Sequence, residues 1–314
     1  SDKYGSYWVA GEFKRPLGVM NQPGARLDSI EKNILIDTTR YIYDLDLRKS
    51  VVAKDGVSME LLFPSGAMLH TIKDNEVRQK CFKTLNNYLS DLNGFYKGVL
   101  QVPNNPADAL KIISNYKDIR FIMFPIYLPD SSYSDGNWNQ CFELCQKRDI
   151  IICFHAGALR YKNPIKSDIF QSYTHKTSIL FFQAYELLND LIIGGIVEKF
   201  DGLKFIISEL GVSWVPYWHH RITTGLSIYS SLDGLSSKNL IQTLNKNFYF
   251  TTQFDFPDSS LFEIIGENNV LFGTDFPHVE STHGQTINIF NDINKKLGKG
   301  LGSKIFYENF SKLI

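Results

Sequence analysis

Two kinds of hydrophobic pattern alternate along the chain from residue 57 onward. Short runs of β-branched, aromatic and aliphatic residues each end in a turn, and a segment with helical periodicity follows. The runs are continuously apolar and do not alternate with polar residues, which predicts strands of a sheet buried on both faces. There are seven of these strand-like runs, at 57–64, 95–103, 119–127, 149–157, 203–211, 247–254 and 269–277.

The segments between these runs have the period of amphipathic helices, the clearest being 74–92, 105–117, 136–148 and 177–200. Strand–helix alternation sustained this long predicts parallel βα units, which occur both in doubly wound sheets and in closed barrels. Polar residues follow nearly every strand, at the face where the chemistry of barrels collects. We therefore predict the α/β class and a (β/α)8 TIM barrel, although the count is one strand short of eight.

Residues 1–56 do not share this alternation. Their first half is rich in Gly, Pro and aromatic residues without a sustained period, which predicts an irregular but ordered excursion across the barrel. The segment becomes helical towards its end, with Gly56 as the expected C-cap. We predict one domain over 1–314. The longest connection without periodicity is 158–176, and loops of that length often cover active sites.

Composition and charge narrow the classes of function. Hydrophobic residues make up 43% and charged residues 21%, as in a globular protein with a full core. The sequence has 33 basic residues (Lys and Arg) and 33 acidic residues (Asp and Glu). It has no run of basic residues that would favour nucleic acid or an anionic membrane as a partner. No apolar run approaches the length of a membrane span. The four cysteines form no CxxC pair, which favours a reduced, cytoplasmic protein.

Three of the predicted strands end in ionisable residues, namely His155, Glu209 and Asp275. A buried charge needs a partner or a metal ion, because isolated burial costs several kcal/mol. An imidazole together with carboxylates at a barrel mouth suits Zn²⁺ or Mn²⁺. Taken singly, His155 is better explained by an ordinary hydrogen bond, and Asp275 is equally well explained by a structural cap on the next loop. Their joint placement at strand ends favours a functional site.

Five stretches of the sequence stand out as motifs, namely "KDGVSMELLFPS", "ICFHAG", "LIIGGIVEKFDGLKFIISELGVSWVPYWHHRI", "VLFGTDFPH" and "KIFYENFSKLI". Together they resemble the amidohydrolase-related family, a branch of the amidohydrolase superfamily that includes decarboxylases of aminocarboxymuconate semialdehyde, resorcylate and carboxyvanillate. The resemblance runs in family order from about Trp8 to the C-terminus. Its most specific part is the pair formed by the 195–222 and 270–278 blocks.

This resemblance implies a (β/α)8 barrel with one divalent metal ion at its C-terminal mouth. It implies that His155 and Asp275 are metal ligands and that Asp275 also exchanges a proton with substrate or water. Glu209 stands where several family members carry a catalytic histidine, which leaves open whether an imidazole activates water here. His278 is expected to bind substrate or to orient Asp275. Arg160 is either a clamp for a substrate carboxylate or a surface residue.

The chain departs from the family at its first strand, which normally carries a His-x-His or Glu-x-His pair. No such pair occurs in the sequence. We favour the explanation that the natural chain extends before Ser1 and that the preceding segment supplies this strand. The rival explanation is that 33–41 is a degenerate first strand, with Thr38 and Arg40 where ligands belong. The metal site would then be lost or weak.

The function expected from these observations is that of a metal-dependent decarboxylase or hydrolase acting on a small, carboxylate-bearing organic substrate. Glu209 in place of an imidazole slightly favours decarboxylation. The resemblance also implies a homodimer. The alternative is a catalytically inactive binding or scaffold protein on the same barrel, which gains weight only if the first strand is degenerate.

Overall fold

A computed structural model of the chain describes residues 7–10, 13–16, 40–64, 69–70, 72–157, 174–175, 177–229, 237–255, 257–278 and 280–314. The chain divides into two compact units, which are described separately below. The first unit comprises Ser1–Gly98 and Gly273–Ser303, and the second comprises Val99–Phe272 and Lys304–Ile314.

The second unit contains a six-stranded parallel sheet in the order β10-β9-β8-β7-β6-β5. Each strand therefore pairs with the strand that precedes or follows it in the chain, as expected for successive βα units. The strands are β5 (Leu100–Gln101), β6 (Phe121–Met123), β7 (Ile151–His155), β8 (Phe205–Ser208), β9 (Phe248–Thr252) and β10 (Val270–Phe272).

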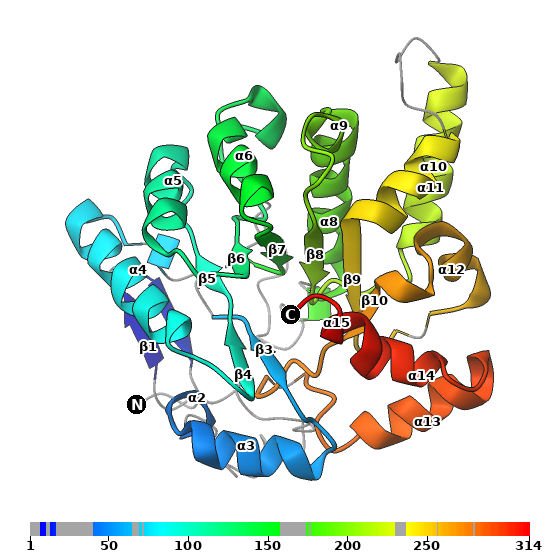
Figure 1. Cartoon of the computed structure of the whole chain (residues 1–314), viewed down its shortest axis with the longest axis horizontal. Helices are drawn as coiled ribbons and strands as arrows, with labels where there is room; N and C mark the ends of the chain where they lie inside the picture. The colour runs from blue at the N-terminus through cyan, green and yellow to red at the C-terminus, as the bar shows by residue number, and fades with distance from the viewer. Residues whose placement is uncertain are drawn as a thin grey trace. The chain divides into compact units, whose positions relative to one another are not determined.

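Helices connect these strands and lie along the outer side of the sheet (Figure 1). The helical elements are η2 (Tyr133–Asp135), α5 (Pro106–Asn115), α6 (Asn139–Lys147), α8 (Phe181–Leu188), η3 (Asn189–Ile193), α9 (Ile196–Lys199), α10 (Val215–Ile228), α11 (Ser237–Asn247), α12 (Ser259–Ile265), η4 (Glu267–Asn269), η5 (Lys304–Glu308) and α15 (Asn309–Ser311). Two of these helices begin at a side-chain cap. The side chain of Asn105 accepts the N–H of Asp108 at the start of α5, and that of Asp258 accepts the N–H of Leu261 at the start of α12.

Apolar side chains fill the space between this sheet and its helices. The first four residues of β7 are all buried, as the continuous apolar pattern predicts for a strand covered on both faces. The cysteines of α6 are buried in the same layer, and burial raises the pKa of the Cys141 thiol to about 12. They are therefore core residues. An aromatic cluster packs beside β7, formed by Phe124, Tyr133, Trp138, Phe142 and Phe154.

The first unit combines a hairpin, a parallel strand pair and helices. Strands β1 and β2 pair antiparallel, whereas β3 and β4 pair parallel with Glu60 opposite Tyr96. Gly56 has φ +85° just after α3, as predicted for the end of that helix. The elements are β1 (Tyr7–Ala10), β2 (Phe13–Pro16), α2 (Arg40–Tyr43), α3 (Leu45–Lys54), β3 (Glu60–Leu62), α4 (Asn75–Ser90), β4 (Tyr96–Gly98), α13 (Thr286–Leu297) and α14 (Leu301–Ser303).

Each of the seven predicted strand runs contains a strand, and the run 95–103 holds both β4 and β5, separated by Val99. The described strands from β3 onward form a six-stranded and a two-stranded parallel sheet and do not close into one ring. Of the proposed degenerate first strand, Thr38 lies outside the described residues, and Arg40 begins helix α2. Among the described residues, no helix is both long and apolar enough to cross a membrane.

Candidate functional site

His155 is the last residue of β7, and the parallel register places it opposite Ser208, the last residue of β8. Its Nδ1 lies 2.9 Å from the carbonyl oxygen of Ala156. Because a carbonyl only accepts, Nδ1 carries the hydrogen of this bond. The other ring nitrogen, Nε2, lies 2.9 Å from Oε2 of Glu209. Two lone pairs repel at this distance, so the contact requires a proton on Nε2 or on the carboxyl oxygen, or a cation bound by both atoms.

Glu209 follows β8 directly and has φ +60°. A non-glycine residue in this left-handed region costs about 1–3 kcal/mol, and such residues cluster at functional sites. The neighbouring strand helps to hold it, since the N–H of Glu209 donates to Thr251 Oγ1 at 3.0 Å. The strained backbone turns the carboxylate towards His155.

The turn after Glu209 is held by Asp255, which follows β9. Its Oδ2 accepts the N–H of Val212 and that of Ser213, the latter at 3.0 Å. Gly211 lies inside this turn with φ +67°, and a Cβ there would lie 2.6 Å from Asp255 Oδ2. The turn that carries Glu209 therefore requires glycine at residue 211.

Substitution of Gly211 by alanine is expected to lower the free energy of unfolding by about 1–3 kcal/mol, because the new Cβ is strained at this φ and meets Asp255. Urea unfolding followed by circular dichroism measures the change. The matched control is Gly225→Ala in α10, where a Cβ has open space and the helix should gain about 0.5–1 kcal/mol. Equal stability of Gly211→Ala and the native protein would contradict this account of the turn.

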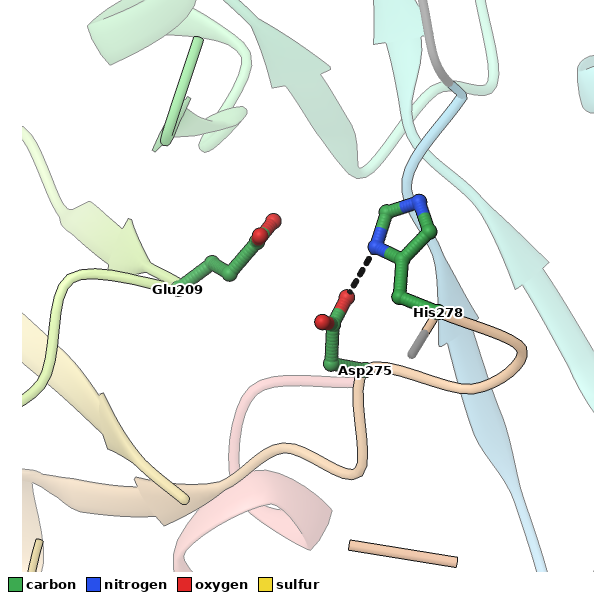
Figure 2. Close-up of side chains that lie close together, drawn as sticks. All are labelled: Glu209, Asp275 and His278. Atoms are coloured by element: carbon green, nitrogen blue, oxygen red, sulfur yellow. Dashed lines mark hydrogen bonds and ion pairs between the residues drawn. The ribbon is translucent and has the colours of Figure 1, made fainter. Parts of the chain in front are cut away.

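In the first unit, Asp275 and His278 form a second pair of site residues. His278 Nδ1 and Asp275 Oδ1 are joined by a 2.7 Å hydrogen bond, drawn as the dashed line in Figure 2, which also labels Glu209. The Asp275 side chain is 8% exposed and that of His278 is 32% exposed. Asp275 has φ +56°, and the N–H of His278 donates to the Asp275 carbonyl at 2.8 Å. One turn thus buries the carboxyl group and leaves part of the imidazole accessible.

The side chains of both pairs have the chemistry of a divalent metal site. Glu209, Asp275 and His278 each offer a ligand atom suited to such an ion. Two neighbouring ligands about 2.1 Å from one ion lie about 3 Å apart when they meet at a right angle. The 2.9 Å separation of His155 Nε2 and Glu209 Oε2 has this spacing. The donor set therefore fits zinc or manganese.

The structure thus brings together His155 with Glu209 and Asp275 with His278, each pair within one unit. Arg160, predicted to clamp a carboxylate, lies outside the described residues. The sequence analysis did not identify Thr251 or Asp255, whose hydroxyl and carboxyl groups hold the Glu209 turn. Their signal in the sequence is their position: Thr251 lies near the C-terminal end of the predicted strand 247–254 and Asp255 directly follows it, at the face where the chemistry of barrels collects.

Comparison with known proteins places this chain in a family. A profile of the amidohydrolase family matches residues 59–312. A 6-methylsalicylic acid decarboxylase of Penicillium expansum is 36% identical over 92 residues, which cover 28% of this chain and 28% of that protein. The match thus spans little more than a quarter of that relative's length.

Solved structures show the same fold. An amidohydrolase of Mycobacterium avium subsp. paratuberculosis K-10 aligns with a TM-score of 0.73 at 15% identity, covering 98% of this chain and 91% of that one. A 5-carboxyvanillate decarboxylase of Novosphingobium aromaticivorans, solved with manganese and 4-hydroxy-3-methoxy-5-nitrobenzoic acid, aligns with a TM-score of 0.69 at 15% identity, covering 85% and 79%.

At these identities the structural likeness concerns the fold, and it confirms the predicted α/β barrel class. The family profile extends from the start of β3 almost to the C-terminus and includes His155, Glu209, Asp275 and His278. It matches well over half of the 314 residues. The chain belongs to the amidohydrolase family.

Proposed function

We propose that this protein is a metal-dependent decarboxylase of a small aromatic carboxylic acid. Its relatives include a 6-methylsalicylic acid decarboxylase, and a protein of similar fold is a 5-carboxyvanillate decarboxylase. The observation that carries the proposal is the Asp275 carboxyl group. It is buried in a strained turn after β10 and hydrogen-bonded to a partly exposed imidazole. Such a group is suited to general acid–base chemistry.

We further propose that His155 and Asp275 are ligands of one divalent ion, with Glu209 beside His155. Zinc and manganese both accept imidazole nitrogen and carboxylate oxygen, and manganese is present in the solved 5-carboxyvanillate decarboxylase. A divalent ion bound there would stabilise negative charge on the oxygens of the substrate. Any further ligands from a first strand are outside the described residues.

The chain's own groups would carry the proton. Asp275 in its protonated form transfers a proton to the ring carbon that bears the carboxylate. The bond to the carboxyl carbon then breaks, and CO₂ leaves as its electron pair returns to the ring. His278 holds the Asp275 carboxyl group through the 2.7 Å bond and passes it a proton from water for the next turnover. We assign Arg160 to the substrate carboxylate and propose that the enzyme acts as a homodimer.

Turnover of aromatic acids tests the proposal. The protein, loaded with Mn²⁺ or Zn²⁺, is incubated separately with 6-methylsalicylate, 2,6-dihydroxybenzoate and 5-carboxyvanillate, and a small lactone serves as a hydrolase substrate. The expected result is CO₂ release with formation of the corresponding phenol, detected by chromatography and mass spectrometry. Lactone opening without CO₂ release would establish a hydrolase. Binding of an acid without turnover under either metal would establish a non-catalytic binding protein.

A further inference from the structure

A buried arginine lies against the turn that carries Asp275. Arg48, on α3, is 7% exposed, and its partner Glu60, at the start of β3, is 8% exposed. Arg48 Nε donates to Glu60 Oε2 at 2.7 Å and Nη2 donates to Oε1 at 2.9 Å. Two parallel hydrogen bonds of this kind fix the plane of the guanidinium group. The sequence analysis gave neither residue a role.

The same guanidinium contacts the Asp275 turn. Arg48 Nη2 donates to the carbonyl oxygen of Phe276 at 2.9 Å, and the guanidinium carbon lies 4.9 Å from the centre of the Phe276 ring. Phe276 is the residue between Asp275 and Pro277, and the turn closes at His278. Glu60 therefore orients the arginine, and the arginine holds the backbone next to the carboxyl group.

Stability alone does not account for this arrangement. A buried ion pair can often be replaced by apolar side chains of similar volume without loss of stability, because desolvation of the charges offsets their attraction. An apolar pair, however, donates no hydrogen bond to a carbonyl group. Asp275 has a left-handed backbone conformation that persists only where its surroundings impose it. The directional bond to Phe276 is such a constraint.

We propose that Arg48 is a positioning residue, which holds the Phe276 carbonyl and thereby fixes the direction of the Asp275 and His278 side chains. The effect on catalysis rests on the proposed function, whereas the effect on the turn does not. Acid–base chemistry requires the donor to lie within hydrogen-bond reach of the reacting atom, and a displacement of about 1 Å costs on the order of 100-fold in rate.

The test variant is Arg48→Met combined with Glu60→Leu, which removes both charges and leaves no unpaired ion in the core. The control is Arg148→Met. Arg148 also donates to backbone carbonyls, those of Ile113, Tyr116 and Lys117, but it lies in the second unit. Circular dichroism and urea unfolding identify conditions in which each protein is folded.

Hydrogen exchange measured by mass spectrometry over residues 273–285 is the first readout. The amides of His278, Ser281 and Thr282 donate to backbone carbonyls within this segment. We expect their exchange to accelerate in the double variant about 10-fold or more, and to stay unchanged in Arg148→Met. Native-like exchange of this segment in the folded double variant would overturn the proposal, whatever the activity.

Turnover is the second readout. We expect the double variant to lose about 10- to 100-fold in kcat with little change in KM, and Arg148→Met to keep the native kcat per folded molecule. Faster exchange with native kcat would overturn the catalytic part of the inference. If the double variant exchanges faster but the native protein turns over no acid, the role of Arg48 in the turn is supported and only the proposed function is contradicted.

Discussion

Replacement of Asp275 by asparagine is expected to lower kcat by about 10³-fold or more while leaving the fold intact. Asparagine has the shape of aspartate and tolerates the left-handed conformation that residue 275 adopts at φ +56°. The amide cannot give up a proton to carbon, and general acid–base groups typically contribute about 10²–10⁴-fold to the rate. Steady-state kinetics on the best substrate, together with urea unfolding, measure the two effects separately.

Asp258→Asn is the matched control for this substitution. Asp258 caps α12 by accepting the N–H of Leu261, and asparagine caps helices equally well. The control should keep both its stability and its kcat. If Asp275→Asn turns over substrate at the native rate, Asp275 does not transfer the proton, and the assignment of the acid–base role to this residue is wrong.

The strand pattern could be predicted because central strands such as β7 and β8 are buried on both faces. Such strands read as unbroken apolar runs, and all seven predicted runs contain a strand. The ends of the strands were harder to predict. The predicted runs extend to 211 and 277, but β8 ends at Ser208 and β10 at Phe272. Beyond these ends, the backbone adopts the left-handed conformations of Glu209 and Asp275. Nothing in the sequence marks these conformations, because neither residue is glycine, the residue that usually adopts them.

The partners of the site residues were also beyond the reach of the sequence. His155 meets Glu209 because β7 and β8 are in a register that places His155 opposite Ser208, and register depends on tertiary packing. Glu60 lies within an apolar run, which indicated a strand but not that its carboxylate pairs with Arg48. A lone buried charge in such a run is itself a signal, because it demands a partner somewhere in the fold.

Loss of the imidazole at residue 155 is expected to weaken metal binding by about 100-fold or more, since even groups that only orient a ligand contribute about 10- to 100-fold to metal affinity. In His155→Ala, Glu209 also loses the partner that its carboxylate contacts at 2.9 Å. After dialysis against metal-free buffer, elemental analysis should find about one ion per native chain and far less in the variant. Titration with manganese gives the change in affinity directly.

His219→Ala separates loss of a ligand from loss of a partly buried imidazole. His219 lies on α10 in the same unit as His155, and burial lowers the pKa of its imidazole below the usual value. Because its imidazole is partly buried on α10 and is not one of the His155 and Glu209 pair, its removal should reduce stability but leave the metal content unchanged. Equal metal content in the native protein and His155→Ala would show that the ion is held without this imidazole. The contact between His155 Nε2 and Glu209 would then be a hydrogen bond through a proton, since a proton is the remaining way to join two such groups.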